Sequence, residues 1–155
     1  MKKLINALFL LIALVTSAVT QAADFGSADE AVAMVKKAVA YLDKNGEEKA
    51  IAEFNNRAGM FVDRDLYIVV HDMQGKVLAN SALPRMVGKN IMDLKDADGK
   101  AFIRERIKML ATANSGWIDF KWPNSVSKEI EGRSVYFAKD KNLVLTCGVR
   151  KKAAS

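Results

Sequence analysis

Short apolar or alternating runs, each closed by turn residues, constrain the fold of this chain more than any other feature. They occupy residues 66–71, 76–80, 116–122, 133–138 and 143–149. Runs of this length, rich in Val, Ile, Leu and aromatic residues, are typical of β-strands. Turn residues 72–75 and 139–142 join neighbouring runs into two hairpins, and Pro123 ends the middle run. We therefore expect five strands in one antiparallel sheet.

Helical patterns surround these strands. Ser27 and Glu30 have the spacing of a capping box. Two apolar stripes follow at helical spacing, which predicts helix over residues 28–62, in two pieces separated at Asn45 and Gly46. The stripes are Ala31, Met34, Val35, Ala38 and Leu42, then Ile51, Phe54, Ala58 and Phe61. A third helix is expected over residues 99–113. This order predicts an α+β domain with a long N-terminal helix packed on the five-stranded sheet.

The N-terminus has the pattern of an export signal. Met1, Lys2 and Lys3 form a basic start, residues 4–15 are apolar apart from Asn6, and small residues follow up to residue 22. This predicts a cleaved signal peptide over residues 1–22, one domain over residues 23–155, and a periplasmic location. An uncleaved membrane anchor is the alternative. The apolar stretch is short for a bilayer span, which favours the signal peptide.

Charge and cysteine content exclude some classes of function. The chain has 24 Lys and Arg against 18 Asp and Glu, and the two signs are interleaved. A nucleic-acid-binding protein would concentrate its bases on one helix or stripe, so we expect no nucleic-acid partner. The mild basicity favours small anionic ligands. Cys147 is the only cysteine, so no intramolecular disulfide can form. It is expected to be a small buried hydrophobe, with a reactive thiol as the alternative.

Several strings of residues resemble one known family in order and spacing. They are residues 66–72 with Gly75 and residues 77–79, Val87-Gly-Lys-Asn90, Asp96-Ala-Asp-Gly-Lys-Ala-Phe102, Gly116-Trp-Ile-Asp-Phe-Lys-Trp-Pro123 and Ser134-Val-Tyr136. On these residues the chain resembles the single-Cache sensor domains, the extracytoplasmic relatives of the PAS fold. The resemblance implies a PAS-like fold, and a pocket on the sheet that binds small carboxylates or similar metabolites. It also implies partners such as a membrane receptor or a histidine kinase.

The chain departs from the family pattern in three places. No membrane helix follows Val149, so it resembles the stand-alone exported members. Asn80 and Ser81 stand where the family often has a His-Pro-like pair. Arg133 stands where the family often has Lys. A guanidinium keeps the capacity to bind anions, and its planar fork suits a carboxylate better than a point charge does.

Seven side chains on the expected strands are candidates for ligand binding. Arg133 could clamp a carboxylate or be an exposed cation at a strand edge. Tyr136 could donate to an anion or pack in the core. Trp117 and Trp122 lie at an odd offset, so at most one of them faces a pocket directly. The full set is Tyr67, His71, Asn80, Trp117, Trp122, Arg133 and Tyr136.

Metal and catalytic sites are not predicted. His71 is the only histidine and has no second ligand at metal spacing, so a structural or pocket-rim role is expected. Asp93, Asp96 and Asp98 do not fit the calcium-loop template, and they are interpreted as a turn and a helix N-cap. No nucleophile, phosphate loop or paired-carboxylate motif is present. We expect a protein without enzymatic activity, metal or cofactor.

Two functions are consistent with these patterns. The first is a periplasmic sensor-type domain that binds a small organic anion, such as a short carboxylate. The second is an interaction module that pairs through its N-terminal helix, as a homodimer or with a membrane receptor, and has a vestigial pocket. The second function requires a filled space over the sheet and a wide apolar stripe exposed on residues 28–62.

Overall fold

The structure is a computed structural model, which describes residues 25–123 and 129–151. The signal peptide expected over residues 1–22 lies outside these ranges. In the described part of the chain, no helix combines the length and apolarity that crossing a membrane requires.

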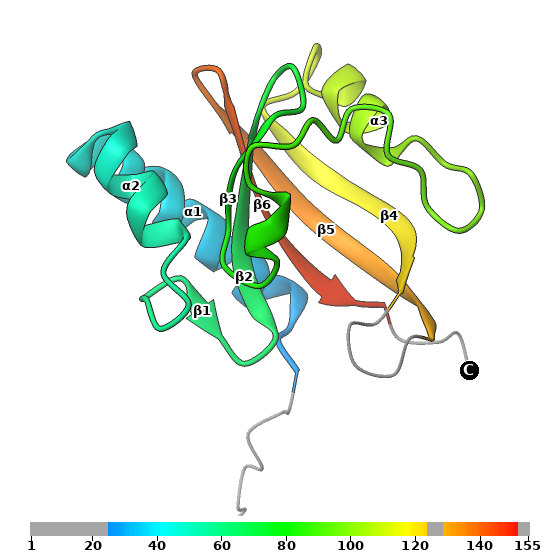
Figure 1. Cartoon of the computed structure of the whole chain (residues 1–155), viewed down its shortest axis with the longest axis horizontal. Helices are drawn as coiled ribbons and strands as arrows, with labels where there is room; N and C mark the ends of the chain where they lie inside the picture. The colour runs from blue at the N-terminus through cyan, green and yellow to red at the C-terminus, as the bar shows by residue number, and fades with distance from the viewer. Residues whose placement is uncertain (1–24, 124–128, 152–155) are drawn as a thin grey trace, which may run out of the picture.

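One antiparallel sheet forms the centre of the molecule (Figure 1). Its strands are β1 (Val62–Asp63), β2 (Leu66–Asp72), β3 (Val77–Asn80), β4 (Ser115–Pro123), β5 (Ile130–Asp140) and β6 (Leu143–Arg150). The order is β1-β2-β6-β5-β4, and β3 also pairs with β2. The five expected strands and both hairpins are confirmed. The sixth strand, β1, has two residues and is too short to give a periodic signal in the sequence.

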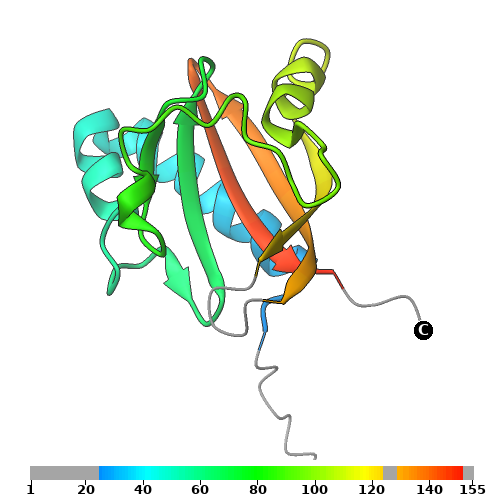
Figure 2. The ribbon, with the colours of Figure 1, turned by 45° about the vertical axis from the view of Figure 1, so that its right-hand side comes forward.

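Alternation along the strands divides the side chains between two faces of the sheet. On β2, Leu66, Ile68 and Val70 lie in the core under the N-terminal helices. Tyr67, Val69 and His71 face the other side, where they line a pocket. Figures 1 and 2 show the N-terminal helices behind the sheet, and the segment 81–101 with the third helix in front of it.

The first helix, α1 (Ala28–Asn45), begins at the predicted capping box. Ser27 Oγ accepts the Glu30 N–H at 3.3 Å, and the Glu30 carboxylate accepts the Ser27 N–H at 2.7 Å. The predicted stripe packs on the sheet, and Ala31, Val35, Ala38 and Leu42 are buried. Gly46 ends the helix with a φ of 82°, a conformation that favours glycine.

The second helix, α2 (Glu47–Phe54), is shorter than predicted. The expectation that helix continues to residue 62 is wrong, because the Asn55 side chain ties the chain to the sheet. Its amide nitrogen donates to the carbonyl of Leu78 at 3.1 Å, and its oxygen accepts the Asn80 N–H at 3.0 Å. Phe61 still reaches the core, with its ring centroid 4.8 Å from that of Phe54.

The third helix, α3 (Phe102–Met109), is also shorter than the predicted span of 99–113. Its N-cap is Ala101, so the expected capping by the aspartate cluster is wrong. Asp96 instead closes a turn, because its Oδ1 accepts the N–H groups of Asp98 and Lys100 at 2.9 and 2.8 Å. Its Oδ2 accepts the Lys121 N–H at 3.0 Å, which attaches this turn to β4.

Candidate functional site

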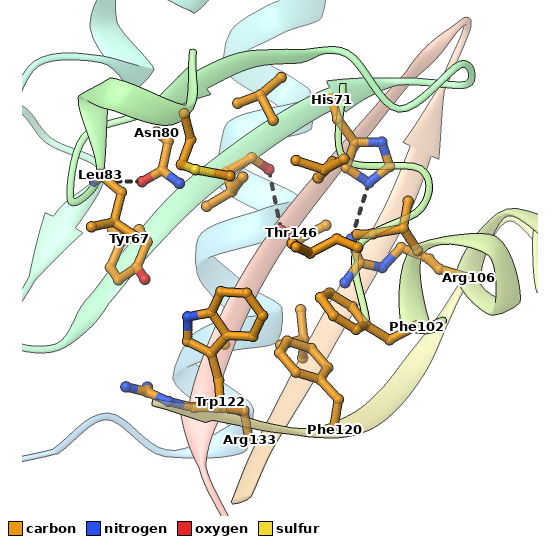
Figure 3. Close-up of a pocket in the computed structure, with 18 residues that line it drawn as sticks. Tyr67, His71, Asn80, Leu83, Phe102, Arg106, Phe120, Trp122, Arg133 and Thr146 are labelled. Carbon is orange, nitrogen blue, oxygen red and sulfur yellow. Dashed lines mark hydrogen bonds between the residues drawn. The ribbon is translucent and has the colours of Figure 1, made fainter. Parts of the chain in front are cut away.

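A partly open pocket of about 150 Å³ lies between the sheet, α3 and the segment 81–94 (Figure 3). Its walls are mostly apolar, and a few polar side chains converge on it. An apolar cavity of this size is known to hold a molecule such as benzene. The lining residues used below are Tyr67, His71, Asn80, Phe102, Arg106, Phe120, Trp122, Arg133, Val135 and Thr146.

Arg106 is the most unusual residue of this pocket. It projects from α3 and is 3% exposed. Its Nη1 lies 3.0 Å from His71 Nε2, and its guanidinium lies 5.8 Å from the ring centroid of Phe137. Its Nε is buried, and no described residue forms a hydrogen bond with it. Within residues 25–123 and 129–151, no carboxylate pairs with it. Burial lowers the pKa of Arg106 to about 10, so it remains charged at neutral pH.

His71 orients this guanidinium without neutralising it. The residue is fully buried, and its Nδ1 lies 2.8 Å from the carbonyl oxygen of Asp72. A carbonyl can only accept, so Nδ1 carries the proton and Nε2 accepts from Arg106. Burial, and then the charge of Arg106, lower the pKa of His71 to about 4. The imidazole is therefore neutral at pH 7, and the positive charge of Arg106 is uncompensated by its neighbour.

A second polar group of side chains lies at the other end of the pocket (Figure 3). Asn80 is 7% exposed, and its Oδ1 accepts the Leu83 N–H at 2.8 Å. Burial raises the pKa of Tyr67, so its hydroxyl keeps its proton and can donate. Arg133 has a side chain that is 20% exposed and lies 3.9 Å from the Glu131 carboxylate. These groups can supply hydrogen bonds to a polar part of a ligand.

Aromatic rings form the wall between the two ends. Phe120 stacks on Phe102, with centroids 4.0 Å apart and planes 12° apart. Trp122 meets Phe102 edge-on at 5.8 Å. The Thr146 hydroxyl donates to the carbonyl of Val69 at 3.2 Å, so this polar group in the floor is already satisfied. The middle of the pocket therefore suits the apolar part of a ligand.

Five of the seven predicted site residues line this pocket: Tyr67, His71, Asn80, Trp122 and Arg133. The expectation for the other two is wrong, because Trp117 and Tyr136 lie on the opposite face. Their rings pack together at 5.3 Å and belong to the core under α1. The cause is strand alternation, since Tyr136 is an odd number of residues from Arg133, as Trp117 is from Trp122.

The sequence interpretation missed Arg106 and the aromatic pair of Phe102 and Phe120. A signal for Arg106 was available, because it lies four residues after Phe102 and four before Leu110. This places a charge in the middle of the apolar stripe of a helix. Across residues 25–123 and 129–151, no group of three or more His, Cys, Asp or Glu side chains could hold a metal ion.

Comparisons with known proteins agree with this fold. The profile of the family described as Single Cache domain 2 matches residues 3–151. A solved structure titled "Structural basis for carboxylic acid recognition by a Cache chemosensory domain" superposes with a TM-score of 0.67 at 19% identity. It covers 80% of this chain and 92% of its own chain. A methyl-accepting chemotaxis protein from Vibrio parahaemolyticus superposes with a TM-score of 0.65 at 25% identity, covering 79% and 86%.

A curated relative is the methyl-accepting chemotaxis protein McpP of Pseudomonas putida. It is 23% identical over 74 residues, which are 48% of this chain and 14% of the relative. The matched part is therefore a small fraction of that receptor.

Proposed function

This chain belongs to the single Cache domain 2 family of non-catalytic sensor domains, and we propose that its pocket binds a small organic anion whose carboxylate pairs with Arg106. The observation that carries this proposal is the buried guanidinium, which has no carboxylate partner in the described part of the chain. An unpaired buried charge destabilises a protein by several kcal/mol. A ligand carboxylate would offset that cost and add a charge-assisted hydrogen bond of about 1.5–3 kcal/mol.

The rest of the pocket limits the size and character of the ligand. A volume of about 150 Å³ admits a short chain or a single small ring. Phe102, Phe120 and Trp122 would contact its carbon atoms, while Tyr67 and Arg133 would contact a polar end. A similar Cache chemosensory domain recognises carboxylic acids, which is consistent with this chemistry.

Cache sensor domains typically lie outside the cytoplasm, and we infer the same location for this domain. We infer that residues 1–22 direct export to the periplasm and are then removed. Two of the similar proteins are methyl-accepting chemotaxis proteins. A membrane receptor or a histidine kinase is therefore the proposed partner, to which the ligand-bound domain would pass its signal.

The alternative role as an interaction module has less support. It required a filled space over the sheet, yet a pocket lies there. It also required an exposed apolar stripe on residues 28–62. The exposed large apolar side chains among the described residues are Phe25, Met60, Val87 and Ile130, and Met60 alone falls in that range. Pairing through α1 is therefore not the function that this surface favours.

The proposal is tested by calorimetry and thermal shift with straight-chain carboxylates on dialysed protein. A ligand at 100 times its Kd should stabilise the wild type by about 2.7 kcal/mol. Arg106→Gln should lose this response. Arg104→Gln is the matched control, because Arg104 lies on the same helix, is exposed and pairs with Asp93. If the wild type responds to no carboxylate, or Arg106→Gln responds equally, the proposal is wrong.

A further inference from the structure

Resting on the proposed function, we propose a narrower ligand class for this pocket: linear dicarboxylates, with one carboxylate on Arg106 and the other on Arg133 at the mouth. The pocket has a cationic group at each end and an apolar wall between them. Figure 3 shows Arg106 and Arg133 at opposite ends of the site, with Phe120 and Trp122 between them.

Arg106 and Arg133 mark the two ends of a row of side chains on one face of β5. Arg133 and Phe137 lie four residues apart on β5 and face the same side. At a rise of about 3.3 Å per residue, their Cα atoms are roughly 13 Å apart. Arg106 sits against the Phe137 ring at 5.8 Å, so it marks the inner end of this row. Arg133 marks the outer end.

The outer end adjoins a second hollow with an excess of positive charge. This groove shares Tyr67, Leu83, Trp122 and Arg133 with the pocket, so the two spaces lie side by side. Among the residues that the structure describes, Asp65 is the one acid that lines it, against five arginines, namely Arg57, Arg64, Arg85, Arg133 and Arg150. A surface of this kind attracts anions and concentrates them at the mouth.

Some of this charge is already compensated. Arg64 pairs with Glu30 and Asp63. Glu131 lies 3.4 Å from Arg150 and 3.9 Å from Arg133, and Asp65 lies 4.0 Å from Arg150. Arg57 and Arg85 have no ion pair within the described ranges. The mouth therefore keeps a surplus of positive charge next to Arg133, which a second carboxylate of the ligand would meet.

The apolar wall between Arg106 and Arg133 restricts the chemistry of the chain that joins the two carboxylates of the ligand. Phe120, Trp122 and Val135 present carbon atoms to the ligand, and a hydroxyl or amine on the spacer would be buried there without a partner. An unsubstituted carbon chain fits best. The ligand must reach from one guanidinium to the other, so the affinity for diacids should depend on chain length.

The test is isothermal titration calorimetry with diacids of four to eight carbons and with monoacids of equal length. In the wild type, the best diacid should bind roughly 10-fold or more tightly than its matched monoacid, with an optimum in chain length. Arg133→Gln should reduce this diacid-to-monoacid ratio to near one, and Arg106→Gln should abolish binding of both. Arg104→Gln should leave both affinities as in the wild type.

The outcomes separate the two proposals. Monoacids that bind through Arg106 without any advantage for diacids would overturn the dicarboxylate proposal and leave the proposed function intact. An equal loss of monoacid and diacid affinity in Arg133→Gln would also overturn it, because Arg133 would then hold the single carboxylate. If no acid of either series binds, the proposed function itself fails.

Discussion

Acidification from pH 8 to pH 5 should weaken the fold through one residue, His71. His71 is fully buried, and burial with the nearby charge of Arg106 lowers its pKa from 6.5 to about 4. The unfolded chain therefore binds a proton at a higher pH than the folded protein does. Stability from this group is complete above pH 6.5 and is lost as the pH falls towards 4.

The shift sets the size of the effect. A difference of one pKa unit corresponds to about 1.4 kcal/mol, so the full loss is about 3.4 kcal/mol and about 2 kcal/mol of it occurs by pH 5. His71 is the only histidine in the sequence, so no other imidazole contributes. Carboxyl groups with lowered pKa values, such as Glu30 at about 2, act mainly below pH 4.5.

The measurement is urea denaturation, followed by far-UV circular dichroism, at half-unit steps between pH 8 and pH 5. The control is His71→Gln, which offers Arg106 an acceptor oxygen and does not titrate. The wild type should lose about 2 kcal/mol of unfolding free energy over this range, and the variant should stay nearly constant. A wild type that is equally stable at both ends, or a variant with the same loss, would refute the reasoning.

The Cys147 thiol is buried and its pKa is raised to about 12, so a thiol reagent should label it only in denaturant, and rapid labelling of the native protein would contradict this. Gly75→Ala should destabilise the fold by about 1–3 kcal/mol in urea denaturation. The reason is that Gly75 has a φ of 83° and that a Cβ there would lie 2.9 Å from the Met92 nitrogen. An unchanged denaturation midpoint would contradict this prediction. Ligand binding should change the fluorescence of Trp122, because this residue lines the pocket. Trp122→Phe should therefore lose the fluorescence change, and Trp117→Phe, on the opposite face, should keep it. The reverse pattern would place the ligand on the other face of the sheet.

Much of the sheet could be predicted because strand signals are local. Each run from residue 66 to residue 149 carries its own apolar residues, and each hairpin has its own turn residues. Alternation also indicated that Trp117 and Trp122 face opposite sides, which the structure agrees with. The same alternation puts Tyr136 and Arg133, which are three residues apart on β5, on opposite faces.

Helix ends were predicted less well because distant contacts decide them. The pattern of α2 continues to Phe61, but the Asn55 side chain bonds to β3, more than twenty residues away, and ends the helix at Phe54. At α3, Asp96 is held by the Lys121 N–H, a partner 25 residues along the chain. Periodicity within a segment contains no information about such partners.

The burial of Arg106 in the candidate site also depends on partners that are distant in the sequence. A charged residue on a helix is expected to be exposed, and its burial here depends on His71 and Phe137, which lie on two different strands. A carboxylate in place of His71 would have neutralised Arg106 and stabilised the empty domain. The neutral imidazole instead holds the guanidinium in place without neutralising it. An anion bound there, as proposed, would stabilise the contact between α3 and the sheet. Ligand binding should for the same reason raise the pKa of His71, because the anion offsets the charge of Arg106. A bound ligand would in this way change the stability of the contact between α3 and β2. It would thereby change the stability of the surface that a partner meets.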